Sequence, residues 1–170
     1  MFLCFLDASK AFDRVNHAKL FDKLVQRGTP GYLVRILIFW YSHQTMLVKW
    51  GDAMSEPFQV SNGVRQGGIL SPYLFNIYMD ELSKKLNACK TGCINGLMLL
   101  NHLTYADDLV ILTPYSGGLQ LLLEICSEYG IEFDIKYNAI KSTIMIIRSK
   151  YDKRTVFPSF ILNGAALIIL

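Results

Sequence analysis

Two adjacent carboxylates, Asp107 and Asp108, follow Tyr105 and Ala106 between two short apolar runs. Each run is typical of a β-strand, so the acidic pair is expected on the tight turn of a hairpin. Two neighbouring negative charges repel each other, and a hard divalent cation with oxygen ligands would offset that repulsion. Taken alone, an Asp-Asp pair is more often a solvated turn, because Asp favours turns through its own backbone hydrogen bonds.

A third carboxylate, Asp7, ends another apolar run, residues 2–6, and lies 100 residues before Asp107. One Asp at the end of a strand and two on a hairpin turn could together hold two metal ions. This arrangement supports two-metal phosphoryl and nucleotidyl transfer. We therefore expect the carboxylates of Asp7, Asp107 and Asp108 to converge on one exposed cleft.

An aromatic residue, Phe12, lies five residues after Asp7, beyond an expected turn. It could stack beneath a nucleotide sugar, and ordinary core packing accounts for its spacing equally well. The next residue, Asp13, has a simpler explanation as a helix N-cap.

A glycine-rich segment, residues 62–72, leads into a predicted helix. Glycine lets backbone amides approach a ligand closely, and a helix N-terminus favours anions. Arg65 adds a fixed positive charge and Gln66 a neutral donor and acceptor, so this is a candidate nucleotide-binding loop. Lys141, in residues 137–142, could approach a triphosphate. A flexible loop and a surface lysine are the plain alternatives.

Strands and helices must position these groups. Strands are expected over residues 2–6, 103–106, 109–112, 142–148 and 157–162, with a hairpin formed by 45–50 and 57–60. Four helices are expected. The first begins at about residue 13 or 16 and ends at 28, and the second covers 32–42. The third begins at residue 71 and has a row of apolar residues on one side that ends at 86, and the fourth covers 118–129. Since two strand pairs are hairpins, the pattern predicts an α+β sandwich with a mostly antiparallel sheet and helices on one face.

Composition limits the alternatives. The 170 residues are 52% hydrophobic, carry a net charge of +3 and have a mean hydropathy of +0.28. They are predicted to form one domain, residues 1–170, with apolar surface to be covered by other parts of a larger protein. No apolar run has the length of a membrane span, and the first residues lack a signal peptide's basic start, so no membrane is expected. The four cysteines lack zinc-ligand spacing, which favours reduced thiols and a cytoplasmic or nuclear location.

Four segments, FLDASKAFD, NGVRQGGILSP, YADD and YNAIKS, resemble in this order and spacing the palm motifs of reverse transcriptases. The resemblance is closest to the polymerases of non-LTR retrotransposons, and it runs from Met1 to about Gly164. It implies a polymerase palm. In that family a fingers region precedes the first motif and a thumb follows the palm, so the resemblance implies a palm truncated at both ends, with fingers and thumb largely missing.

The resemblance also implies cofactors and substrates. Asp7, Asp107 and Asp108 would bind two Mg²⁺ ions, with Mn²⁺ as an alternative. One ion would lower the pKa of the primer 3′-hydroxyl, and the other would hold the triphosphate. The implied partners are an RNA template, a DNA primer and deoxynucleoside triphosphates.

Further residues match family positions that touch the nucleotide. Ala8 would offer a backbone carbonyl to a metal, and Phe12 is similar to the steric gate that excludes a 2′-hydroxyl. Gln66 and Gly67 match the loop that supports the incoming nucleotide and the template base. Lys141 matches a lysine that assists the departure of pyrophosphate.

The sequence leads to three functional hypotheses. The resemblance favours the palm of an RNA-directed DNA polymerase from a retrotransposon-derived reading frame. The alternative is an inactive, truncated retrotransposon remnant. A nucleotidyl cyclase shares palm-like metal chemistry, but the segment RQGGILSP would have no purpose there.

Overall fold

The computed structural model describes residues 1–148, 150–151 and 156–170 of the 170-residue chain. The chain divides into two compact units: unit 1 comprises Met1–Ala11 and Met79–Leu170, and unit 2 comprises Phe12–Tyr78. Helix α3 (Ser71–Ala88) begins in unit 2 and ends in unit 1. None of the helices in the described residues has the length and apolarity that a membrane crossing needs.

Unit 1 is built on a five-stranded sheet with the order β13-β10-β1-β9-β8. The strands are β1 (Phe2–Leu6), β8 (His102–Tyr105), β9 (Asp108–Thr113), β10 (Thr143–Ile146) and β13 (Ile168–Ile169). The central strand β1 pairs antiparallel with both β9 and β10, and β13 pairs parallel with β10. The predicted, mostly antiparallel sheet is therefore confirmed.

Two small hairpins also belong to unit 1. They are formed by β6 (Cys93–Asn95) with β7 (Met98–Leu100), and by β11 (Ile161–Leu162) with β12 (Ala165–Ala166). The first was not predicted. Of the strand expected over residues 157–162, only the last two residues are in a strand.

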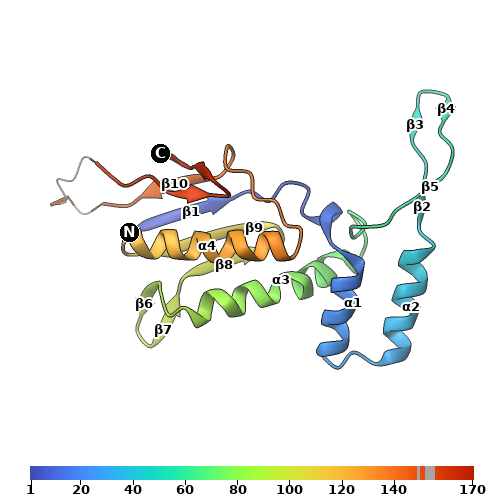
Figure 1. Ribbon diagram of the computed structural model, residues 1–170, viewed down its shortest axis with the longest axis horizontal. Coiled ribbons are helices and arrows are strands. Elements are labelled where there is room, and N and C mark those ends of the chain that lie inside the picture. Colours follow the sequence, from blue (N-terminus) through green and yellow to red (C-terminus); the bar gives the residue numbers. More distant parts are fainter. Residues whose placement is uncertain (149, 152–155) are drawn as a thin grey trace. The chain divides into compact units, whose positions relative to one another are not determined.

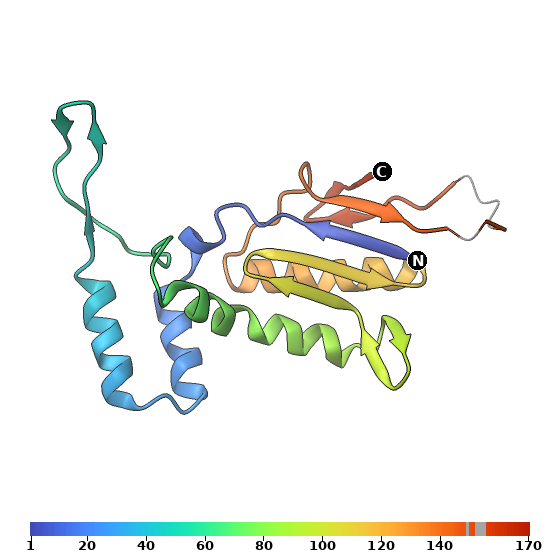
Figure 2. The same ribbon diagram turned by 180° about the vertical axis from the view of Figure 1, so that it is seen from behind.

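Helix α4 (Ser116–Glu132) packs across one face of the sheet, against β1 and β9 (Figure 1). Alternate strand residues point to this face, so the paired residues Cys4 and Ile111 are buried, as are Leu6 and Leu109. Figure 2 shows the sheet from the opposite side, which α4 leaves uncovered. This opposite side is the uncovered face of the sheet.

Unit 2 begins with a short 3₁₀ helix, η1 (Phe12–Arg14), followed by α1 (His17–Gln26) and α2 (Gly31–Ser42), which pack on each other. The N-cap of α1 is Asn16, whose Oδ1 accepts a hydrogen bond from the Lys19 N–H at 3.1 Å. Of the two predicted starts, Asn16 is therefore the cap, and Asp13 lies in η1.

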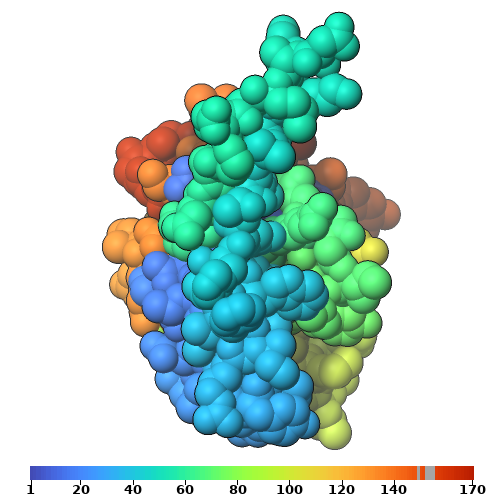
Figure 3. Space-filling view, turned by 90° about the vertical axis from the view of Figure 1, so that its right-hand side faces the viewer, coloured from blue at the N-terminus to red at the C-terminus, as the bar shows by residue number. Residues whose placement is uncertain are grey.

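A hairpin arm, residues 45–59, follows α2. Its base is β2 (Thr45–Met46) paired with β5 (Phe58–Gln59), and its tip is β3 (Lys49–Trp50) paired with β4 (Ala53–Met54). In the space-filling view of Figure 3 the arm extends from the end of α2. A glycine-rich loop, residues 62–70, then leads to α3. The predicted hairpin is confirmed.

Most of the apolar side chains of α2 are not buried. Leu33, Ile36 and Trp40 are 40%, 56% and 64% exposed, and Val34 is the buried residue of this helix. Because α2 is apolar around most of its circumference, periodicity could not identify the side that packs against α1. Figure 3 shows α2 at the surface of unit 2.

Candidate active site

Asp7 and Asp108 lie at neighbouring ends of the paired strands β1 and β9. Strands β1 and β9 pair with Leu6 opposite Leu109, and both of these leucines are buried. Extending the pairing by one residue brings Asp7 opposite Asp108. Since successive residues of a strand point to opposite sides, these two carboxylates belong to the uncovered face.

Asp107 lies on the turn between β8 and β9. Tyr105 pairs with Asp108, which leaves Ala106 and Asp107 as a two-residue connection. The φ angle of Ala106 is +53°, in the left-handed region that the first position of a tight hairpin turn requires. Both acidic residues were expected on the turn. In the structure Asp107 is on it and Asp108 is the first residue of β9, and both are exposed.

The backbone of Asp7 is fixed by residues 137–142, called the Lys141 loop. The Asp7 N–H donates to Oγ of Ser142 at 3.1 Å, and the Asp7 carbonyl accepts from the Asn138 N–H at 2.8 Å. Ser142 is fully buried. Since both polar groups of the Asp7 backbone are bonded to one loop, the starting point of its carboxylate is well defined.

The same loop presents Lys141. Oδ1 of Asn138 accepts from the backbone N–H of Ile140 at 3.0 Å and of Lys141 at 3.3 Å, which closes a tight side-chain turn. Lys141 is exposed and directly precedes Ser142. The predicted lysine therefore belongs to a loop that is hydrogen-bonded to Asp7. The roles of Asn138 and Ser142 were not predicted. Asn138 could have been found, because an Asn side chain commonly accepts hydrogen bonds from the backbone amides two and three residues later and so forms a turn.

Ala8 forms an antiparallel bridge with Tyr137. The hydrogen bonds of this bridge run from Ser9 N–H to Lys136 carbonyl at 2.8 Å and from Asn138 N–H to Asp7 carbonyl at 2.8 Å. The carbonyl oxygen of Ala8 takes no part in either bond.

These oxygen donors suit a hard divalent cation, which prefers carboxylates and carbonyls. Within residues 1–148, 150–151 and 156–170, no three His, Cys, Asp or Glu side chains are gathered as a metal-binding group. Asp7 follows the last residue of β1 that pairs with β9, Asp108 is the first residue of β9, and Asp107 precedes it in the chain. Three like charges repel one another without a cation, which favours side chains turned apart. The types of the donors fit a metal, and the backbone places the three residues at neighbouring strand ends.

In unit 2 the glycine-rich loop is fastened to the residues around the start of α1. The Gly63 N–H donates to the Val15 carbonyl at 2.8 Å, and Nε2 of His17 donates to the Gly63 carbonyl at 2.7 Å. Gly63 has a φ angle of +92°, and a Cβ atom here would come within 2.9 Å of the Asp13 backbone. Only glycine permits this approach, so the loop position depends on it.

Phe12 is held against the same loop. Its carbonyl accepts from the Val64 N–H at 2.8 Å, and its ring stacks on Phe75 of α3, with centroids 4.5 Å apart and planes inclined by 15°. The Phe12 side chain is half-buried. Its backbone and its ring therefore have fixed positions relative to the glycine-rich loop.

Exposed polar side chains follow in the loop. Arg65 and Gln66 line a groove of about 640 Å³ between the loop and the hairpin arm. Nε2 of Gln66 lies 3.4 Å from Oδ1 of Asp13, which is a weak hydrogen bond. Arg65 and Gln66 are exposed, so a ligand in this groove can reach them, and the adjoining Gly67 is exposed as well.

The chain was compared with known proteins. A family model described as "Reverse transcriptase (RNA-dependent DNA polymerase)" matches residues 1–157. The Pol polyprotein of retrotransposable element R2DM of Drosophila melanogaster is 36% identical over 136 residues, which are 80% of this chain and 13% of that protein. The RNA-directed DNA polymerase of mobile element jockey of Drosophila funebris is 33% identical over 144 residues, covering 81% and 15%. The chain thus spans about an eighth to a sixth of the length of these relatives.

Among solved structures, a telomerase of Candida tropicalis matches 97% of this chain and 29% of its own, with a TM-score of 0.68 at 16% identity. At that identity the match supports the fold alone, which is that of a polymerase palm fragment. The family model and the curated relatives each match most of the sequence, and the residues that the family model matches include Asp7, Asp107 and Asp108. The chain therefore belongs to the reverse transcriptase family of RNA-directed DNA polymerases, and within it to the non-LTR retrotransposon type.

Proposed function

We propose that residues 1–170 are a palm domain that adds deoxynucleotides to a primer 3′-hydroxyl on an RNA template by two-metal nucleotidyl transfer. The observation that supports the proposal is the pairing of β1 with β9, whose last pair, Leu6 with Leu109, directly adjoins Asp7 and Asp108, with Asp107 on the adjoining turn. Carboxylates from two neighbouring strands are the ligands that a pair of bridged ions needs.

Asp7, Asp107 and Asp108 would hold two Mg²⁺ or Mn²⁺ ions, and the Ala8 carbonyl would add an oxygen ligand. When bound, the ions lower the pKa of the primer 3′-hydroxyl and stabilise charge on the triphosphate. The bonds from Ser142 and Asn138 hold the Asp7 backbone in place, which supports this role because metal catalysis depends on ligands in fixed positions.

Lys141 would act on the leaving group. Its loop is bonded to Asp7 through the next residue, Ser142, and its side chain is exposed. A positive charge at this place would stabilise the negative charge that develops on pyrophosphate as the bond to it breaks.

Nucleotide selection is assigned to unit 2. Phe12 would exclude the 2′-hydroxyl of a ribonucleotide, and its contacts with Phe75 and Val64 support a ring of fixed position. Arg65, Gln66 and Gly67 would contact the nucleotide. Their exposure, and the groove that Arg65 and Gln66 line, support that assignment.

The partners would be the RNA template, the DNA primer and deoxynucleoside triphosphates. Affinity for a nucleic acid duplex comes largely from many Lys and Arg contacts to phosphates. With a net charge of +3, this chain can supply few of these contacts. Small errors in substrate position are costly in rate. We therefore expect the 170 residues alone to extend a primer slowly or not at all, with the fingers and thumb of a longer protein supplying the further contacts.

A graft tests the proposal. Residues 1–157 would replace the matching segment of an active R2 polymerase, and primer extension on RNA would be measured with Mg²⁺ and deoxynucleotides. The graft should extend the primer, Asp107→Ala in the graft should abolish extension, and Asp52→Ala on the hairpin arm should leave it unchanged. A graft that melts cooperatively yet is inactive while its parent works would instead support the inactive-remnant interpretation.

A further inference from the structure

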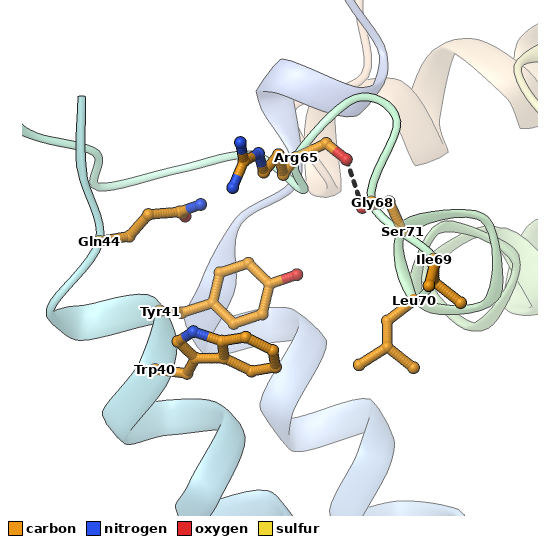
Figure 4. A pocket seen from close by; sticks show the side chains of 8 residues that line it. All are labelled: Trp40, Tyr41, Gln44, Arg65, Gly68, Ile69, Leu70 and Ser71. Atoms are coloured by element: carbon orange, nitrogen blue, oxygen red, sulfur yellow. Dashed lines mark hydrogen bonds between the residues drawn. The ribbon is translucent and has the colours of Figure 1, made fainter. Parts of the chain in front are cut away.

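A second cavity of unit 2 lies on the α2 side of the glycine-rich loop. Its volume is about 410 Å³, within the range of small-molecule sites. Figure 4 shows its lining: one wall comes from the end of α2 and the residues that follow it, with Trp40, Tyr41 and Gln44, and the other from the loop and the start of α3, with Arg65, Leu70 and Ser71.

The first wall presents two aromatic rings. The Trp40 indole is 64% exposed. The Tyr41 ring is half-buried and is fixed from behind by the ring of His17, whose centroid lies 4.8 Å away at 64°. Partial burial raises the pKa of Tyr41, so its phenol is neutral at physiological pH. In Figure 4 the two rings lie next to each other and face Leu70 across the cavity. They form a preformed surface for a flat ligand.

The second wall presents an unpaired cation. In the part of the chain that the structure describes, no carboxylate forms an ion pair with the Arg65 guanidinium. The backbone that carries it is fixed, because the Arg65 carbonyl accepts from the Gly68 N–H at 3.0 Å and from the Ser71 hydroxyl (Figure 4). The Gln44 amide, with donor and acceptor atoms, lines the same cavity.

Proteins bind single nucleic acid strands with groups of these kinds: an exposed indole, a guanidinium and an amide. Aromatic rings stack on a base, and the cation binds a phosphate. We propose that the pocket formed by Trp40, Tyr41 and Arg65 binds one unpaired nucleobase with its adjoining phosphate. An apolar polypeptide segment fits less well, since it would cover Arg65 without pairing its charge. The inference rests on the proposed function, in which the strand is the RNA template.

Tryptophan fluorescence tests the proposal on the 170-residue chain. The sequence has two tryptophans, and Trp50, at the tip of the hairpin arm, is 84% exposed. In the variant Trp50→Phe, emission reports on Trp40 alone. Titration with a five-nucleotide oligoadenylate, without divalent ions or triphosphates, should quench this emission in a saturable way. The quenching should weaken with salt, and Arg65→Gln should raise the Kd about tenfold.

Trp40→Phe is the matched control, because only Trp50 then emits and its emission should not change. The ribo and deoxyribo forms of the oligonucleotide distinguish the strand: tighter ribo binding identifies an RNA strand, and equal binding identifies a site for either strand. Adenosine monophosphate carries one base and its phosphate, so it should compete with the oligonucleotide, and failure to compete would overturn the assignment of these two groups to the pocket.

Three results would overturn the proposal itself. In the first, the fluorescence anisotropy of a labelled oligonucleotide shows that it binds the chain, while the emission of Trp40 stays constant. Another is no binding up to millimolar oligonucleotide. The third is a concentration-dependent blue shift of Trp40 without oligonucleotide, because a second copy of the chain would then cover the pocket. Since no metal or triphosphate is present, this test can fail while the graft still extends a primer.

Discussion

The Ser142 hydroxyl accepts a hydrogen bond from the backbone N–H of Asp7 at 3.1 Å, although the two residues lie 135 positions apart in the sequence. Ser142 is fully buried and directly follows Lys141. The residue proposed as a metal ligand and the lysine proposed to act on the triphosphate are therefore linked through one side chain. Disturbing that side chain should affect both.

Ser142→Ala removes the acceptor and leaves the Asp7 N–H without its partner. We expect the free energy of unfolding to fall by about 1–3 kcal/mol, because a buried unpaired donor is costly. Urea denaturation followed by circular dichroism measures the change. The control is Ser127→Ala in α4, where alanine favours the helix and stability should hold or rise slightly. Equal loss in both variants would show that the Asp7 bond contributes little.

Gly63→Ala should destabilise unit 2. The new Cβ would lie 2.9 Å from the Asp13 backbone, and the φ angle of +92° is unfavourable for alanine. We expect a loss of more than about 2 kcal/mol, seen as a lower urea midpoint. Gly51→Ala is the control, since its φ is also positive, at +60°, and no atom lies within 4 Å of the new Cβ. That variant should lose about 1 kcal/mol. A loss at Gly63 no larger than at Gly51 would contradict the close approach.

Much of the local structure was predictable because the signals are local. The two carboxylates between two apolar runs predicted the β8–β9 hairpin. Asn16, the N-cap of α1, was one of the two starts predicted for that helix. The unpredicted β6–β7 hairpin also had a signal, since Asn95 pairs with Met98 and Gly96, with a φ angle of +63°, is the first of the two connecting residues, where tight hairpin turns favour glycine.

Long-range features were not predictable. The bond between Ser142 and Asp7 joins distant segments, and neither residue type indicates the other. The parallel pairing of β13 with β10 depends on how the chain returns after β12. The packed side of α2 is selected by its contact with α1, because the helix itself is apolar on several sides. In each case tertiary packing decided what the sequence pattern left open.

Phe12→Ala in the graft should admit ribonucleotides. Removing the ring opens space where a 2′-hydroxyl would lie, so the ratio of kcat/KM for ribo- over deoxynucleotides should rise at least about tenfold. Single-nucleotide extension measures both rates. Phe12→Tyr keeps the ring and should keep the discrimination. An unchanged ratio for the alanine variant would remove Phe12 from the selection of the sugar.

The four cysteines, which are free thiols, should fall into two classes of reactivity. Burial raises the pKa of Cys4 to about 12 and raises that of Cys126 as well, so the reactive thiolate is scarce at pH 8. Cys89 and Cys93 are only half-buried. A chromogenic disulfide reagent should titrate two thiols quickly in the folded chain and four after denaturation. Four equally fast thiols would contradict the burial of Cys4 and Cys126.

Binding of Mn²⁺ tests the central claim most directly, because it requires neither template nor primer. Free Mn²⁺ would be followed by electron paramagnetic resonance during titration of the chain, its Asp7→Asn and Asp107→Asn variants, and Asp52→Asn as an exposed control. We expect saturable binding that approaches two ions, weakened at least about tenfold in both active-site variants and unchanged by Asp52→Asn. Binding that is absent, or that is equal in all four proteins, would contradict a metal site at Asp7, Asp107 and Asp108.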